Sequence, residues 1–170
     1  MTEMVTRRVG RVLLIVAMLA TIGCDRITKH VASSRLAGMP SASYFADTVR
    51  LAYVENSGGF LSLGAGLPAG ARTAIFIVTT GLMLVILAVF AFRHRSSPWT
   101  AIGLALFVAG GTSNWIDRVV RGRVVDFLNI GIGSLRTGIF NVADVAIMLG
   151  VVAVVLGELR RGRAHLSAGR

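Results

Sequence analysis

The chain has 170 residues, of which 54% are hydrophobic and only 15% are charged, and its mean hydropathy is +0.72. Soluble globular domains carry about 25% charged residues, so this composition disfavours a soluble enzyme and a disordered chain and indicates a protein that lies largely in lipid. Eighteen Lys and Arg residues against eight Asp and Glu residues give a net charge of +10. Because the arginines border apolar runs and no aromatic residues interleave with them, they indicate a membrane surface and not nucleic acid.

The first apolar run, residues 12–24, is short for a membrane span. Charged Arg11 and Asp25 flank it, and such side chains can reach the two membrane interfaces, so the sequence predicts a span over about residues 10–27. A cleaved signal peptide is the alternative, because basic residues precede the run and Gly23-Cys24 resembles the end of a lipoprotein cleavage box. Thr21 stands where that box usually has leucine, which favours the span.

Three longer apolar runs follow, and a helical span needs about 20 such residues. Residues 73–92 carry no charge and end at a basic stretch, and residues 98–116 are also uncharged and begin with Pro98 and Trp99, a typical helix start and interfacial anchor. Residues 137–157 contain a single charge, Asp144. We therefore expect four spans, at about 10–27, 73–92, 98–116 and 137–157.

Two long segments separate these spans, at about residues 28–72 and 117–136. Residues 48–55 alternate apolar and polar side chains, residues 122–131 repeat the pattern, and glycine-rich turns surround both, which predicts strands. Lys and Arg are denser in the terminal segments than in these two, which places both termini in the cytoplasm. The predicted fold is a mainly α membrane protein: one integral membrane domain over residues 1–170, with four transmembrane helices and a small extracytoplasmic β-platform.

Two carboxylates stand in apolar surroundings and require an explanation. Asp144 lies about five residues inside the predicted fourth span, roughly 7.5 Å deep, and an ionised aspartate at the bilayer centre costs about 2.5–3.5 kcal/mol on insertion scales. Asn141, three residues earlier, is expected on the same helical face. Apolar neighbours predict a raised pKa for Asp126. If Asp126 and Asp144 face each other, they form a pair that can share one proton and activate water.

The end of the third span presents three more polar groups on one face, since Asn114, Asp117 and Arg118 are spaced i, i+3 and i+4. Two other readings of the carboxylates remain open from spacing alone. Both aspartates could form structural ion pairs with arginines at positions 118, 121 or 123, or three aspartates could hold a hard cation. Scattered histidines argue against a metal site, and no serine or cysteine nucleophile motif is present.

Five motifs are more specific than the features described so far: Asp25-Arg-Ile-Thr-Lys29, Asn56-Ser-Gly58, Asn114-Trp-Ile-Asp-Arg118, Gly122-Arg-Val-Val-Asp-Phe127 and Phe140-Asn-Val-Ala-Asp144. They stand in the order and spacing of the lipoprotein signal peptidase family, and the chain resembles signal peptidase II. Any one of the motifs is weak evidence, but several in register across all four predicted spans are specific.

The resemblance implies a multi-pass aspartic endopeptidase of the bacterial inner membrane. Such an enzyme removes the signal peptide from prolipoproteins by cutting before a diacylglyceryl-modified cysteine, near the extracytoplasmic face. The family's catalytic pair maps onto Asp126 and Asp144. Its other motif positions, with substrate-binding or supporting roles, fall on Asp25, Lys29, Asn56, Gly58, Asn114, Asp117, Arg118 and Asn141, among which Asn56 and Arg118 look most like substrate-facing groups. No metal or cofactor is expected, and the partners are prolipoprotein substrates and membrane lipid, with the chain a monomer.

The chain departs from the family pattern in two places. Phe60-Leu61-Ser62 replaces the usual Ala-Phe before the serine, and residues 109–113 read Ala-Gly-Gly-Thr-Ser where Gly-Gly-Ala-x-Gly is common. A specialised paralogue with a narrow substrate set is therefore one alternative. A non-catalytic transporter or scaffold subunit is another, although the polar groups are expected at one membrane face and not along a path through the bilayer.

Overall fold

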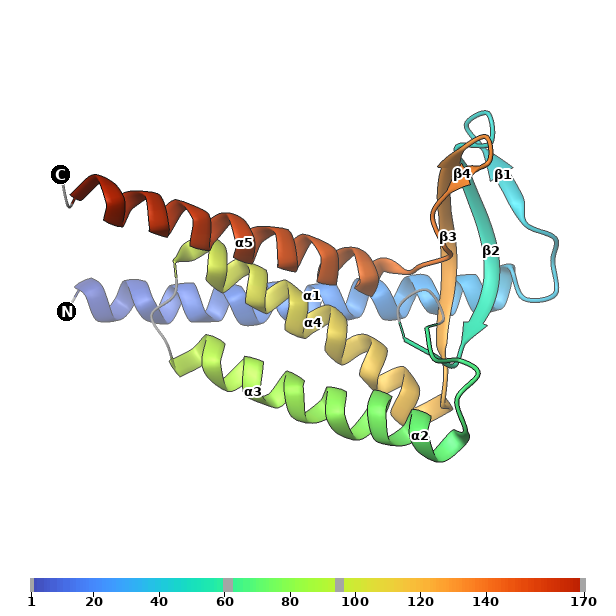
Figure 1. Cartoon of the computed structure of the whole chain (residues 1–170), viewed down its shortest axis with the longest axis horizontal. Helices are drawn as coiled ribbons and strands as arrows, with labels where there is room; N and C mark the ends of the chain where they lie inside the picture. The colour runs from blue at the N-terminus through green and yellow to red at the C-terminus, as the bar shows by residue number, and fades with distance from the viewer. Residues whose placement is uncertain (1, 60–62, 94–96, 169–170) are drawn as a thin grey trace.

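The computed structural model describes residues 2–59, 63–93 and 97–168. The helices lie side by side along the long axis of the molecule, and a small sheet stands across one end of them (Figure 1). In chain order the helical elements are α1 (Thr2–Arg35), α2 (Ala69–Thr73), the π-helical η2 (Ala74–Thr79), α3 (Thr80–Arg93), α4 (Pro98–Arg121) and α5 (Val142–Ala168). Both ends of the chain lie at the end of the bundle opposite the sheet (Figure 1). The departure at residues 60–62 lies outside the described residues.

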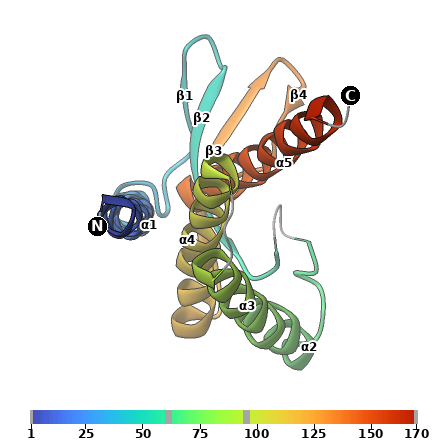
Figure 2. The same cartoon turned by 90° about the vertical axis from the view of Figure 1, so that its left-hand side faces the viewer.

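α4 is the central helix, with α1, α3 and α5 arranged around it (Figure 2). Its start follows the sequence prediction, because the Ser97 side chain accepts a hydrogen bond from the Thr100 amide and Pro98 opens the first turn. Gly122 ends the helix in the left-handed conformation that glycine adopts without strain. Being covered by three neighbours, α4 can carry small and polar residues that a lipid-exposed helix would not tolerate.

α4 and α5 approach each other closely. A Cβ atom added to Gly103 would lie 2.6 Å from the Gly150 carbonyl oxygen, and one added to Gly150 would lie 2.6 Å from the Gly103 oxygen. Small residues at facing positions let helix backbones pack at short range in membrane proteins. This contact fixes how α5 sits against α4, and with it the two ends that carry Asp144 and Asn114.

Two helical stretches, Ala69–Ala91 and Val142–Gly162, are long and apolar enough to cross a membrane. Only 6% of the most apolar part of the first is buried, so most of its surface is left for lipid. Over the described residues, α1 and α4 are not selected by the same test of length and apolar character, so it does not confirm the predicted spans at 10–27 and 98–116. α1 also continues to Arg35, well into the predicted outer loop, because Lys29 pairs with Asp25 one turn earlier and Ala32 packs against the sheet.

The predicted strands are confirmed. The sheet has the order β1-β2-β3-β4 and is antiparallel throughout, with β1 at Ala42–Tyr44, β2 at Val49–Asn56, β3 at Val124–Ile132 and β4 at Leu135–Arg136. β2 and β3 come from the two long segments between helices, and an irregularity between Leu51 and Val54 shifts their pairing. Val125 and Phe127 of β3 pack with Ala32 of α1, which holds the sheet on the bundle.

α5 begins five residues later than the predicted span. Residues 137–140 are not helical: the Phe140 carbonyl accepts hydrogen bonds from the amides of Phe127 and Leu128, and the Phe140 amide donates to the Leu128 carbonyl. The segment therefore satisfies its backbone groups against β3 before the helix starts. The placement of Asp144 about five residues inside the helix was wrong, since it lies in the first turn.

Candidate active site

Asp144 is held by the start of its own helix. The Asn141 side chain accepts a hydrogen bond from the Asp144 amide (3.0 Å), and Asp144 Oδ2 accepts one from the Asn141 amide (3.1 Å). This reciprocal pair is a capping box, which satisfies two backbone donors that a helix start leaves free. The three-residue spacing predicted that Asn141 lies on the same helical face as Asp144. Asn141 is instead the capping residue that precedes the helix.

Asp126 reaches the same place from β3. Asn141 Nδ2 donates to Asp126 Oδ1 at 2.6 Å, and Asn56 Nδ2 of β2 donates to Asp126 Oδ2 at 2.9 Å. One residue, Asn141, therefore contacts both carboxylates. Asp126 is 3% exposed and Asp144 is 8% exposed. The structure brings the two predicted catalytic residues together from different segments of the chain.

The ion-pair alternative for these carboxylates does not hold. Arg118 donates to the Gly58 and Asn114 carbonyl oxygens, and Arg123 pairs with Glu55 at 2.9 Å. Within the described ranges, no Lys, Arg or His lies within ion-pair distance of either aspartate, whose side-chain partners are neutral amides. Amides orient a carboxylate without cancelling its charge, so a pair of this kind favours sharing one proton.

The pKa of Asp126 is raised, as the apolar sequence around it predicts. Burial is the main cause, because it penalises the charged form. Hydrogen bonds from Asn56 and Asn141 and the charges of Lys29 and Arg118 act in the opposite direction and do not outweigh it. Asp126 therefore holds a proton to higher pH than an exposed aspartate does.

Asn114 of α4 connects the carboxylates to a buried charge cluster. Its Nδ2 donates to Asp144 Oδ1 at 2.9 Å, while its Oδ1 accepts from Lys29 Nζ at 2.7 Å. Lys29 also pairs with Asp25 at 2.7 Å and with Asp117 at 2.8 Å. Because Lys29 is a donor only, it fixes the orientation of the Asn114 amide and so keeps the amide nitrogen on Asp144.

Three partners of this cluster were not predicted as site residues. Arg26 donates to Asp117 Oδ1 at 2.9 Å, Ser113 donates to Asp25 Oδ2 at 2.7 Å, and the amide of Ala143 donates to Asp25 Oδ1 at 2.8 Å. Arg26 lies inside the Asp25–Lys29 motif, and Ser113 adjoins Asn114 and is one of the family departures. The backbone donor leaves no sequence signal.

Asn56 and Arg118 organise the loop after β2. The Asn56 side chain accepts from the Gly58 amide at 2.9 Å and donates to the Gly59 carbonyl at 2.9 Å. Arg118 binds the Gly58 carbonyl through Nε and Nη2, and its guanidinium lies over the Phe76 ring at 5.6 Å. Both residues, expected to face substrate, thus have internal partners that fix the loop beside the aspartates.

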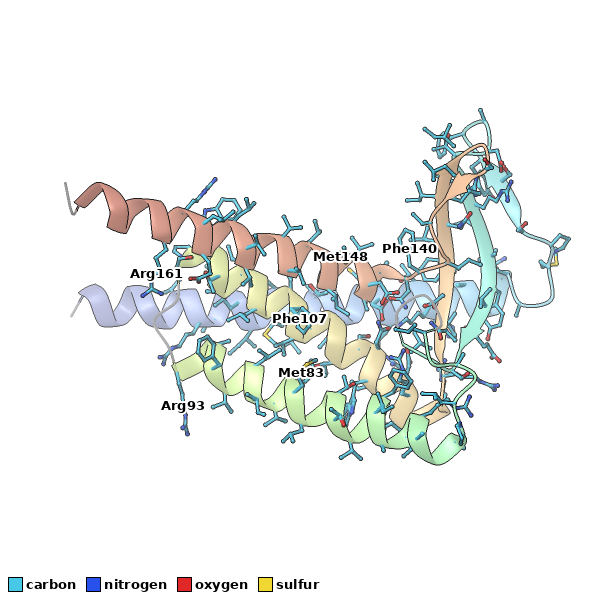
Figure 3. All side chains as sticks on the ribbon, in the orientation of Figure 1. Met83, Arg93, Phe107, Phe140, Met148 and Arg161 are labelled. Carbon is cyan, nitrogen blue, oxygen red and sulfur yellow. The ribbon has the colours of Figure 1, made fainter. Side chains whose placement is uncertain are left out.

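Asp144 lines an apolar groove. The groove has a volume of about 380 Å³ and is lined by Thr137, Gly138, Phe140, Asp144, Val145, Met148 and Leu149. Phe140 and Met148 lie at the sheet end of α5 (Figure 3). A carboxylate in the wall of an apolar groove can act on a bond that an apolar chain carries into the groove. The described part of the chain contains no group of three or more His, Cys, Asp or Glu side chains placed to hold a metal ion.

Comparisons with known proteins identify the family of the chain. The family described as Signal peptidase (SPase) II matches residues 17–160. A lipoprotein signal peptidase of Paraburkholderia phymatum is 33% identical over 142 residues, covering 82% of each chain, and one of Chlorobium phaeobacteroides is 35% identical over 144 residues, covering 78% of this chain and 86% of its own.

Two solved structures, each described as a bacterial membrane enzyme, share the fold. One has a TM-score of 0.76 at 24% identity and covers 86% of this chain and 92% of its own; the other has a TM-score of 0.74 at 23% identity and covers 87% and 88%. The sequence match across most of the chain, together with the aspartates gathered at the end of the bundle, settles its affiliation. The chain belongs to the signal peptidase II family.

Proposed function

We propose that the chain is a membrane aspartic endopeptidase that removes signal peptides from prolipoproteins by cutting before the diacylglyceryl-modified cysteine. The observation that carries the proposal is the pairing of Asp126 and Asp144 through Asn141. Both carboxylates are buried with no cationic partner among the described residues, and Asp144 lines an apolar groove. Membership of a family of lipoprotein signal peptidases supplies the substrate class.

The pair hydrolyses the peptide bond with one shared proton. The ionised carboxylate takes a proton from water as the water oxygen bonds to the scissile carbonyl carbon, and the protonated carboxylic acid donates its proton to the carbonyl oxygen. The resulting tetrahedral diol collapses when the carbon–nitrogen bond breaks. The leaving nitrogen receives the proton that came from water, and one diol hydroxyl returns its proton to the other carboxylate, which restores the singly protonated pair. The two aspartates titrate as a unit, so the roles belong to the pair.

The neighbouring residues keep the carboxylates in place for this reaction. Asn141 and Asn56 hold Asp126, and Asn141 and Asn114 hold Asp144. Fixed hydrogen bonds reduce the reorganisation needed when charge moves during the reaction. Behind Asn114, Lys29 acts as a positioning residue through the amide it binds.

The groove supports a substrate that stays in the lipid. Its lining from Val145, Met148 and Leu149 belongs to the outer side of a helix apolar enough to cross the membrane. A signal peptide lying along this face brings its scissile bond to Asp144 without leaving the bilayer. A water-soluble protease has no comparable access to a lipid-modified chain.

We further propose four transmembrane helices in the bacterial inner membrane, with cytoplasmic termini and the aspartates near the extracytoplasmic face. Arg93 and Arg161 support this orientation, since they lie at the end of the bundle away from the sheet (Figure 3), and arginines concentrate on the cytoplasmic side. The length of α1 also fits: its 34 residues extend about 51 Å at 1.5 Å per residue, enough to cross the bilayer and reach past the sheet.

The test is processing of a diacylglyceryl-modified prolipoprotein by the purified protein in lipid bilayers, read as the mass of the products. We expect a single cut before the modified cysteine, which Asp126→Asn and Asp144→Asn each abolish. Asp47→Asn is the matched control, because Asp47 is a partly exposed carboxylate of the turn between β1 and β2 that pairs with Arg50 and does not line the groove. Normal processing by either of the first two variants, or solute flux without cleavage by the wild type, would contradict the proposal.

A further inference from the structure

The helix that follows the loop after β2 contains a π-helical turn near its start. α2, η2 and α3 form one rod (Figure 1), and η2 spans Ala74–Thr79. In a π-helix each amide bonds to the carbonyl five residues earlier, so the turn is wider than an α-helical turn and its side chains point in different directions. Such turns are rare and occur frequently at functional sites. η2 therefore lies where a changed side-chain direction can reach the loop beside the aspartates.

Contacts from α4 and from η2 itself stabilise the wide turn. The Trp115 indole Nε1 of α4 donates to the Ile77 carbonyl at 2.8 Å, and the Thr79 hydroxyl donates to the Ala74 carbonyl, five residues earlier, at 3.1 Å. Gly81 leaves room for the indole, since a Cβ atom at that position would lie 2.9 Å from Trp115 Nε1. η2 is thus fixed against α4, the helix that carries Arg118.

The side chain of Phe76 lies on this turn and contacts both Arg118 and the loop. The centre of its ring lies 5.6 Å from Arg118 Cζ. A Cβ atom added to Gly59 or to Gly64 would lie 3.0 or 3.1 Å from the nearest ring atom. Because a side chain at either glycine would push against the ring, the loop and the ring fit closely together.

Arg118 has no carboxylate among its described hydrogen-bond partners. Its Nε and Nη2 donate to the Gly58 carbonyl, and its Nη1 donates to the Asn114 carbonyl at 3.2 Å. Carbonyl oxygens accept hydrogen bonds but do not hold a cation by opposite charge. The negative face of an aromatic ring attracts a cation within about 6 Å of its centre. Phe76 therefore supplies an electrostatic attraction that no acidic side chain supplies to Arg118 in the described part of the chain.

We propose that Phe76 is a positioning residue of the peptidase: its ring holds the Arg118 guanidinium on the Gly58 carbonyl and so keeps the loop beside the two aspartates. The Asn56 side chain accepts from the Gly58 amide and donates to Asp126 Oδ2, each at 2.9 Å. A shift of Gly58 therefore reaches Asp126 through a single side chain. The inference rests on the proposed function, since it assigns a role in that reaction.

The test replaces Phe76 in the full-length protein by phenylalanines that carry increasing numbers of fluorine atoms. Fluorine withdraws negative charge from the face of the ring, so the attraction to a cation weakens in steps while the apolar shape is kept. Cyclohexylalanine is the last member of the series, because it is apolar and of similar size but has no aromatic face. The same series at Phe107 of α4 is the matched control, since no cation lies over that ring among the described residues.

Two quantities are measured in lipid bicelles. The first is kcat and KM for cleavage of a diacylglyceryl-modified prolipoprotein. The second is the NMR shift of the Arg118 Nε proton, which is assigned by its loss in Arg118→Lys. An aromatic ring close to this proton displaces its shift, and cyclohexylalanine has no such ring current. The shift thus reports the contact between the two side chains and needs no catalysis.

We expect kcat to fall in steps along the Phe76 series, by about two- to fivefold at cyclohexylalanine. KM should stay constant, because Phe76 does not line the groove on α5, and the displaced proton shift should vanish at cyclohexylalanine. The Phe107 series should change neither quantity.

An unchanged kcat, an equal fall at every step, or an equal response at position 107 overturns the proposal, because the aromatic face would then have no role of its own. A proton shift that is the same with phenylalanine and cyclohexylalanine also overturns it. A wild type that shows the displaced shift but cleaves no prolipoprotein overturns both the proposed function and the role of Phe76 in it. Loss of the stepwise response in an active enzyme overturns the role of Phe76 alone.

Discussion

Lys29→Met tests whether the buried charge cluster holds the active site together. The Lys29 side chain is 3% exposed and contacts two carboxylates and the Asn114 amide oxygen at 2.7–2.8 Å. Removing one partner of a buried ion pair costs about 3–5 kcal/mol, because the other charge stays buried. Asp117 retains Arg26 and Asp25 retains two hydrogen bonds, so we expect the lower end, about 3 kcal/mol, or about a hundredfold in the folding equilibrium.

The measurement is the free energy of unfolding in bicelles, with prolipoprotein processing followed in parallel. Arg26→Gln is the control: its side chain is 37% exposed, and ion pairs of that kind contribute about 0–1 kcal/mol. Lys29→Met should also lower the rate of processing at temperatures where it is fully folded, because the Asn114 amide is no longer oriented toward Asp144. A stability loss no larger than that of Arg26→Gln, with an unchanged rate, would refute the role given to Lys29.

Three further outcomes follow from the geometry. Because folding raises the pKa of Asp126, the folded state binds the proton more tightly than the unfolded state does. The stability of the wild type relative to Asp126→Asn should therefore fall as pH rises above about 4, by at most about 1.4 kcal/mol per pH unit, and level off above the folded pKa. A difference in denaturation midpoints that stays constant from pH 4 to 8 would contradict this. Gly150→Ala places a Cβ 2.6 Å from the Gly103 oxygen and should cost about 1–3 kcal/mol, whereas Gly10→Ala, with no neighbour within 4 Å, should be neutral or stabilising. Asn141→Ala removes a helix cap worth about 0.5–2 kcal/mol and should reduce kcat by far more than that loss of stability explains; equal kcat would show that the Asn141 contacts do not position the pair.

Local sequence signals predicted the elements that depend on local energetics. Pro98 marked the start of α4, and the alternating pattern identified β2 and β3. The helix continues to Arg121, past the predicted end at residue 116. The start of α5 could not be read in the same way. Residues 137–140 carry no charge, like most of the helix that follows. Their hydrogen bonds to β3 exclude them from the helix, and that contact exists only once the chain has folded.

In the candidate site, too, local sequence features were predicted and contacts that depend on packing were not. Carboxylates in apolar sequence are conspicuous, so Asp126 and Asp144 could be singled out before their partners were known. The amide that links them was placed on the wrong part of its helix, since a three-residue spacing fits both a shared helical face and a capping box. The buried contacts of Lys29 depend on how α1 packs against α4, and a lysine beside an aspartate in sequence does not reveal whether the pair is exposed or enclosed.

The initial rate of prolipoprotein cleavage by Asp126→Asn, Asp144→Asn and the double variant tests the central claim most directly. Residues that act as one unit are not additive: removing either costs about as much as removing both. We therefore predict that each single variant loses essentially all activity and that the double variant is no slower. A single variant that keeps a rate close to the wild type, or single losses that multiply in the double variant, would contradict catalysis by a carboxylate pair.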